Sequence, residues 1–211
     1  HADETTVQVL REAGRAATTS SYMWLYRSGR YGPPITLFEY QPTRAGEHPR
    51  RFLKGFKGYL HVDGYAGYNG LPNSVLVGCW SHARRKSDEA LKSMPAPLRS
   101  TPSAARDGMQ FCNELFAIER KLRDKTPEER YAERLEQSAP ILDVFFKWLN
   151  EQEGLVAPKS FIGQAISYCL NQWEKLTAFL LDGQLEIDNN RSERPIRPFV
   201  MGRKNWPFFK H

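Results

Sequence analysis

The hydrophobic pattern of this chain changes its period near residue 80, and that change limits the folds the chain can adopt. Before it, short runs rich in aromatic, β-branched and hydroxyl residues are separated by glycine and proline, which is typical of strands joined by turns. After it, apolar residues recur at helical spacing to about residue 183. An α/β fold is therefore expected, with most of its helices in the middle of the chain.

Four candidate strands lie in the first part of the chain, at residues 19–27, 35–40, 58–63 and 74–80. The first two are bounded by glycine and proline, which favours an antiparallel hairpin. The last run is almost continuously apolar, as is typical of a strand buried on both faces. A short helix is expected at residues 49–56.

Three apolar stripes at helical spacing follow. They extend over residues 109–122, 141–149 and 162–180, and each predicts a helix whose stripe faces the core. Ser103 and Ser160 are the expected N-caps of the first and third of these helices.

Composition excludes several classes of protein. With 211 residues, 40% of them hydrophobic, the chain has enough apolar surface for one domain or two small ones. No window approaches the roughly 18 apolar residues of a membrane span. The three cysteines form no CxxC pair, so reduced thiols are expected rather than a zinc ribbon or a disulfide framework. The net charge of +6 is modest, so its distribution matters more than its size.

The segment 184–211 gathers basic and aromatic residues. Interleaved in this way, they suit contact with a phosphate backbone and stacking on bases. The alternative is a solvated helix face with a few core anchors. The basic residues of the segment are Arg191, Arg194, Arg197, Arg203, Lys204 and Lys210.

Three acidic residues stand out by their context. Asp3 lies near the start of the chain, Asp63 ends an apolar run before a glycine-rich loop, and Glu193 falls in the first turns of a helix expected after residues 188–190. Three such carboxylates, brought together, can share two Mg²⁺ ions about 3.5–4 Å apart that align the attacking and leaving oxygens on phosphorus. Context alone does not select them, because the chain has 24 acidic residues and most aspartates at strand ends are turn formers.

Four sequence blocks carry a resemblance. HADET at 1–5, GYLHVDGYAGYN at 58–69, GCWSHARRK at 78–86 and LEIDNNRSERPIRPFVMGRKNW at 185–206 resemble the signature blocks of the insertion sequence 66 family of bacterial transposases. The blocks stand in the family's order and span nearly the whole chain.

The resemblance implies an α/β fold with a ribonuclease-H-like mixed sheet flanked by helices. Residues 1–86 and 184–211 would form this catalytic core. A large all-helical insertion, residues 87–183, would separate the second catalytic carboxylate from the third.

The resemblance also implies an Asp-Asp-Glu triad. Position by position, Asp3, Asp63 and Glu193 become the catalytic residues and the ligands of Mg²⁺, for which Mn²⁺ can substitute, and no organic cofactor is expected. Glu186 and Asp188 lie close enough in sequence to stay alternatives for the third ligand.

The activity implied is that of a DNA transposase, which cuts insertion-element ends and joins them to target DNA. Its partners would be double-stranded DNA and further copies of the chain, in the bacterial cytoplasm at the nucleoid. Two alternatives stay open, a non-catalytic DNA-binding remnant or accessory protein and a generic ribonuclease-H-like nuclease. Complete family members carry an N-terminal DNA-binding region with a zinc module and usually continue past the last block, so an excised catalytic fragment or a truncated copy is expected.

The expected DNA-binding residues are basic and fall in the last two blocks: Arg84, Arg85, Lys86, Arg194, Arg197, Arg203 and Lys204. For the first three residues, the alternative is that they lie on an exposed helix face without contacting DNA. For Arg194, the alternative is an ion pair that holds a carboxylate. His82 is a possible auxiliary residue that contacts phosphate or positions a metal-bound water, or else makes a structural hydrogen bond at a helix start. Asp188 is a second possible auxiliary residue.

Overall fold

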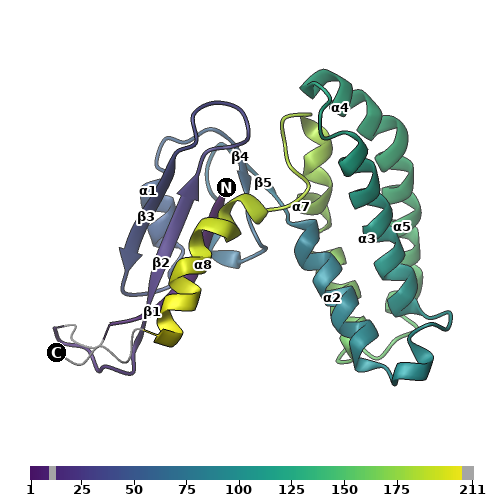
Figure 1. Cartoon of the computed structure of the whole chain (residues 1–211), viewed down its shortest axis with the longest axis horizontal. Helices are drawn as coiled ribbons and strands as arrows, with labels where there is room; N and C mark the ends of the chain where they lie inside the picture. Colours follow the sequence, from purple (N-terminus) through teal and green to yellow (C-terminus); the bar gives the residue numbers. More distant parts are fainter. Residues whose placement is uncertain (10–12, 206–211) are drawn as a thin grey trace. The chain divides into compact units, whose positions relative to one another are not determined.

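The computed structural model describes residues 1–9 and 13–205, with side chains described as far as residue 201. It is a mixed α/β structure with two compact units (Figure 1). The first unit comprises His1–Leu76 and Asn189–His211, and the second comprises Val77–Asp188. These boundaries differ by several residues from the division expected at 86/87 and 183/184. The roles of catalytic core and insertion stay predictions.

The strands form two small sheets rather than one continuous mixed sheet. Three antiparallel strands form the first sheet in the order β1 (Ala2–Gln8), β2 (Ser20–Arg27) and β3 (Thr36–Gln41). The second sheet pairs β4 (Gly58–His61) with β5 (Ser74–Val77). Both strands of the second sheet are shorter than predicted.

Two local features account for the shorter strands. Gly64 has a φ of +101°, a backbone conformation that favours glycine, so the chain turns just after Asp63. At the other strand, helix α2 already begins at Trp80. A short helix, α1 (Glu47–Phe52), and a 3-10 turn, η1 (Ala66–Tyr68), complete this region.

The register of the first sheet fixes which side chains share a face. Asp3 pairs with Leu25, and Leu25 pairs with Phe38, so these three lie in one row across the strands. The Phe38 ring lies 5.0 Å from the Phe199 ring, centroid to centroid. Helix α8 (Asn190–Asn205), which carries Phe199, therefore covers the face on which Asp3 lies (Figure 1).

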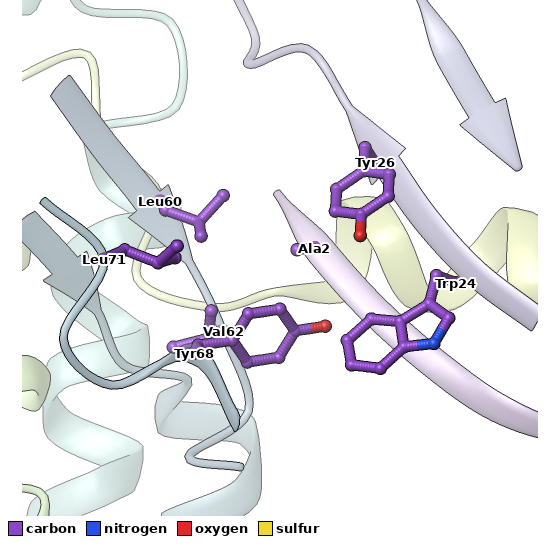
Figure 2. Packing of buried hydrophobic residues seen from close by; sticks show 7 residues of the cluster. All are labelled: Ala2, Trp24, Tyr26, Leu60, Val62, Tyr68 and Leu71. Carbon is purple, nitrogen blue, oxygen red and sulfur yellow. The ribbon is translucent and has the colours of Figure 1, made fainter. Parts of the chain in front are cut away.

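The core of the first unit joins the two sheets by side-chain packing. In Figure 2, the Tyr68 ring points towards the Trp24 indole, and Leu60 and Val62 lie on the side of β4. The Tyr68 and Trp24 rings meet edge to face, with centroids 5.7 Å apart. The buried cluster consists of Ala2, Trp24, Tyr26, Leu60, Val62, Tyr68 and Leu71. This apolar contact packs Leu60 of β4 against residues of β1 and β2.

The second unit is helical, as the apolar stripes predict. Its elements are α2 (Trp80–Ser93), η2 (Ala96–Leu98), α3 (Ala104–Lys121), α4 (Pro127–Glu133), the π-helical η3 (Arg134–Ser138), α5 (Ala139–Glu153), α6 (Phe161–Asn171), α7 (Trp173–Thr177) and η4 (Ala178–Leu181). Cys79, Cys112 and Cys169 are buried thiols. None of the helices described is long and apolar enough to cross a membrane.

Both predicted N-cap residues stand at the starts of their helices, but one predicted helix is interrupted. The Ser160 hydroxyl accepts a hydrogen bond from the Gly163 amide at 3.1 Å, as an N-cap does. Ser103 is the N-cap residue of α3, and its carbonyl accepts a hydrogen bond from the Asp107 amide at 3.0 Å, but its hydroxyl donates to the Met94 sulfur at 3.8 Å instead of capping the helix. The helix predicted over 162–180 breaks at Gln172.

A cluster of charged side chains links the helices of the second unit to the segment that follows them. Arg134 is fully buried, and its guanidinium donates to both carboxylate oxygens of Glu119, at 2.6 and 2.8 Å. It also donates to the carbonyls of Phe179 (2.9 Å) and Leu185 (2.8 Å). Arg130 adds a second contact to Glu119 at 3.3 Å. The protein itself therefore neutralises this largely buried acid and provides hydrogen bonds to both of its carboxylate oxygens.

Candidate active site

Three separate elements of the first unit carry the predicted carboxylates. Asp3 is the second residue of β1, Asp63 follows the end of β4 by two residues, and Glu193 lies in the first turn of α8. All three side chains are half-buried. Asp63 and Glu193 both act electrostatically on Asp3, so residues far apart in sequence meet in one acidic cluster.

Burial and like charge perturb Asp3 strongly. Burial is the largest cause, and together with the charges of Asp63, Glu4 and Glu193 it raises the pKa of Asp3 to about 8. The Glu4 amide donates to Asp3 Oδ1 at 2.8 Å, which acts in the opposite direction but is outweighed. The charges that shift the pKa of Asp3 are all negative, and a cation placed among them would reverse this shift.

The turn after β4 fixes the carboxylate of Asp63. The Tyr65 amide donates to Asp63 Oδ1 at 2.9 Å, which closes an Asx-type turn through Gly64. The turn holds the carboxylate two residues past the end of β4, where the sequence pattern predicted the strand itself to end.

Glu4, which the sequence analysis did not single out, lies on the opposite face of β1 from Asp3. Its carboxylate accepts hydrogen bonds from Arg44 Nε at 2.9 Å and from the Tyr68 hydroxyl at 2.7 Å. Burial raises the pKa of Glu4, and these two hydrogen bonds act against that rise. The charge of Glu4 therefore has hydrogen-bonding partners within the fold. Its place in the same sequence block as Asp3 was the only signal for it.

Helix α8 reaches the site despite two internal prolines, Pro195 and Pro198. Pro195 has no N–H, so it cannot donate to the carbonyl of Arg191 one turn earlier. Arg27, at the end of β2, donates to that carbonyl instead, from Nη1 at 2.9 Å. The contact secures the first turn of α8, which carries Glu193.

The basic residues of the last sequence block lie along α8. Arg194 and Arg197 are exposed, whereas Ile196 between them is buried and anchors the helix. Arg203 and Lys204 belong to α8 by their backbone, but their side chains lie outside the described part of the chain.

The basic residues of the third block lie on α2, in the second unit. Arg84 is exposed and donates to Asn113 Oδ1 at 2.8 Å. Lys86 lies over the Tyr168 ring, with Nζ 5.3 Å from its centroid. Arg85 is exposed. Contact of these three residues with DNA stays a prediction.

The two possible auxiliary residues also belong to the second unit, whereas the three carboxylates belong to the first. Asp188 Oδ2 accepts a hydrogen bond from the Ser81 hydroxyl at 3.2 Å. His82 lies in the first turn of α2, and its amide donates to the Cys79 carbonyl at 3.1 Å. Their auxiliary roles stay predictions.

Comparison with known proteins identifies the family to which the chain belongs. A model of the family described as "Transposase IS66 family" matches residues 1–211. Two uncharacterised proteins of Sinorhizobium fredii are similar to the chain. One, y4hP, is 31% identical over 99% of this chain and 40% of its own length, and the other, y4qI, is 36% identical over 97% and 39%.

The chain thus spans about two-fifths of the length of these relatives. No solved structure gives a significant match. Because the family model covers every residue from 1 to 211, the chain belongs to the IS66 family of transposases.

Proposed function

We propose that this chain is the catalytic part of a DNA transposase, which performs Mg²⁺-dependent phosphodiester hydrolysis and strand transfer at insertion-element ends. One observation carries the proposal. Asp63 and Glu193, two of the three predicted catalytic residues, help to raise the pKa of the third, Asp3, to about 8. Strongly perturbed acids gathered in this way are typical of functional sites.

The donor set fits a divalent cation. Mg²⁺ prefers oxygen ligands and keeps several waters, so the three carboxylates of Asp3, Asp63 and Glu193 would suffice to hold it. When bound, the metal would lower the pKa of a water and stabilise the charge that develops on the phosphate. Without metal, the cluster leaves like charges close together in a half-buried place.

The reaction proposed has two steps and no covalent enzyme intermediate. Water attacks phosphorus at the element end, and the bond to the 3′ oxygen breaks to leave a 3′-hydroxyl. That hydroxyl then attacks a phosphodiester of the target DNA and displaces another 3′ oxygen. The carboxylates orient these groups, and exposed Arg194 and Arg197 hold the DNA backbone near Glu193.

The remaining assignments belong to the same proposal. The first unit would be a ribonuclease-H-like core and the second its helical insertion. Double-stranded DNA would contact both units, and the chain would act as a homo-oligomer on it. Beyond Arg194 and Arg197, the proposed phosphate contacts are Arg84, Arg85, Lys86, Arg203 and Lys204.

The test compares two matched Asp→Asn variants in the cleavage of DNA that carries element ends. Asp63→Asn is expected to abolish Mg²⁺- or Mn²⁺-dependent nicking while circular dichroism and thermal unfolding show an intact fold. Asp143→Asn, at an exposed position on α5, is expected to leave nicking unchanged.

Full activity of the Asp63→Asn variant would overturn the triad. Salt-sensitive binding with no cleavage by the unmodified chain would favour the DNA-binding accessory protein. Cleavage with no preference for element ends would favour a generic nuclease.

A further inference from the structure

Three polar side chains that the proposed chemistry does not use are buried together in the first unit. His1 is 7% exposed, His61 is 4% exposed and Asn189 is 1% exposed. Each belongs to one of the sequence blocks that also contain a carboxylate of the cluster. Buried polar groups are costly unless they are hydrogen-bonded or packed, so their contacts indicate what they do.

The three side chains contact one another. The rings of His1 and His61 are stacked, with centroids 4.2 Å apart and planes 17° from parallel. His1 Nδ1 lies 2.9 Å from Asn189 Oδ1, and Asn189 Nδ2 donates to the Ala2 carbonyl at 2.8 Å. The bond to the carbonyl fixes the orientation of the amide, so its oxygen faces the histidine and His1 Nδ1 is the donor.

The spacing in sequence links the two histidines to two carboxylates. His1 lies two residues before Asp3, and His61 lies two residues before Asp63. Because only one residue separates each histidine from its carboxylate, a contact that fixes the histidine also restrains the backbone that carries the carboxylate. Stacking of the two rings therefore ties the start of the chain, just before Asp3, to the end of β4, just before Asp63.

Asn189 makes the same link to the third carboxylate. Its backbone carbonyl accepts hydrogen bonds from the amide of Ser192 at 3.0 Å and from the amide of Glu193 at 3.3 Å. It thereby closes the first turn of α8, while its side chain ties that turn to His1 and to the Ala2 carbonyl of β1. One residue thus connects the helix of Glu193 to the strand of Asp3.

We infer that His1, His61 and Asn189 form a positioning layer, which holds the three carboxylates at the spacing a divalent cation requires. Because this role presupposes a metal on the carboxylates, it rests on the proposed function. Residues behind metal ligands orient them, and their loss commonly weakens metal binding about 10–100-fold. The layer would hold the site ready before the metal binds, since its contacts involve only the protein.

The test measures Mn²⁺ affinity of the whole chain by electron paramagnetic resonance of the free ion, with no DNA present. The Asn189→Ala variant is expected to bind Mn²⁺ about 10–100-fold more weakly than the unmodified chain. His48→Ala is the matched control, because His48 is a buried histidine of the same unit (4% exposed) whose ring contacts Thr43 and Trp24. It is expected to lower stability without changing Mn²⁺ affinity.

A second pair of variants tests the same role even if the Asn189→Ala variant fails to fold. His61→Phe retains an aromatic ring to stack on His1, whereas His61→Ala does not. Mn²⁺ affinity is therefore expected to stay closer to that of the unmodified chain in His61→Phe than in His61→Ala.

Equal affinity of Asn189→Ala, His61→Ala and the unmodified chain for Mn²⁺ would overturn the positioning layer while leaving the proposed function intact. So would a loss of affinity in His48→Ala as large as that in Asn189→Ala, since a general effect of instability would then explain both. If the unmodified chain binds no Mn²⁺, or if Asp63→Asn binds it equally well, the proposed function fails and the role of the layer fails with it.

Discussion

Two partly buried acids in different units of this molecule have different surroundings. Glu119, in the second unit, receives both arms of the Arg134 guanidinium and a further contact from Arg130. Asp3, in the first unit, is acted on by the like charges of Asp63 and Glu193. The first acid is held by groups of opposite charge, whereas burial and like charges raise the pKa of the second.

The difference teaches how to tell a structural charge cluster from a functional one. Removing a charge from water is unfavourable, so a cluster that serves only the fold provides the opposite charge itself. A cluster that concentrates one sign of charge suits a ligand of the other sign. The neighbouring pair Asp3 and Glu4 repeats the contrast within a single strand, because Glu4 has Arg44 and Tyr68 as partners.

The largest expected effect comes from breaking the neutralised cluster. Arg134→Ala removes the partner of a buried carboxylate and a donor to several carbonyls. The free energy of unfolding is expected to fall by about 3–5 kcal/mol. Urea unfolding measures it.

The matched control is an exposed ion pair of the same unit. Lys125 lies 3.4 Å from Glu133, and both side chains are at least partly exposed. Lys125→Ala is expected to change the free energy of unfolding by no more than about 1 kcal/mol. Equal costs for Arg134→Ala and Lys125→Ala would remove the basis for calling the Glu119 cluster structural.

The acidic cluster predicts a pH dependence of the metal-free chain. The folded pKa of Asp3, about 8, exceeds the roughly 3.9 of an unfolded aspartate. Between these values the folded state keeps a proton that the unfolded state has lost, so the stabilising contribution is complete below the lower value and disappears as pH rises through the upper one. In EDTA, the free energy of unfolding is expected to fall over this range.

The Asp3→Asn variant is the comparison, because it keeps the size of the side chain and removes its titration. Its unfolding free energy is expected to fall less steeply with pH than that of the unmodified chain. Identical slopes for the two proteins would show that Asp3 has no raised pKa.

The smallest expected effect concerns the helix that carries Glu193. Arg27→Met removes the donor to the Arg191 carbonyl, and the expected cost is about 1 kcal/mol. In a Pro195→Ala background, alanine supplies the N–H that proline lacks, so the same Arg27 change is expected to cost less. A double-mutant cycle on urea unfolding measures the coupling between the two positions. Additive changes in the free energy of unfolding would show that Arg27 does not replace the hydrogen bond that Pro195 cannot make.

Local sequence patterns predicted the features that depend on neighbours in the chain. The strands at 19–27 and 35–40, the Ser160 cap and the position of Glu193 in the first turn of a helix are all present. Periodicity did not predict the break at Gln172, because the interruption leaves the apolar stripe intact.

Long-range contacts account for what the sequence could not predict. The bond between Asn189 and the Ala2 carbonyl joins residues 187 positions apart, and the one between Arg27 and the Arg191 carbonyl joins residues 164 apart. No local pattern contains such pairs. The sequence blocks contain these residues, but only the folded chain relates them to the carboxylates.

The most direct test of the acidic cluster is a crystal of this chain soaked in Mn²⁺, with anomalous difference density measured at the metal's absorption edge. The cluster predicts density bounded by Asp3, Asp63 and Glu193, and its loss in crystals of the Asp63→Asn variant. No Mn²⁺ density at these carboxylates, or density held by Asp188 in place of Glu193, would contradict the assignment.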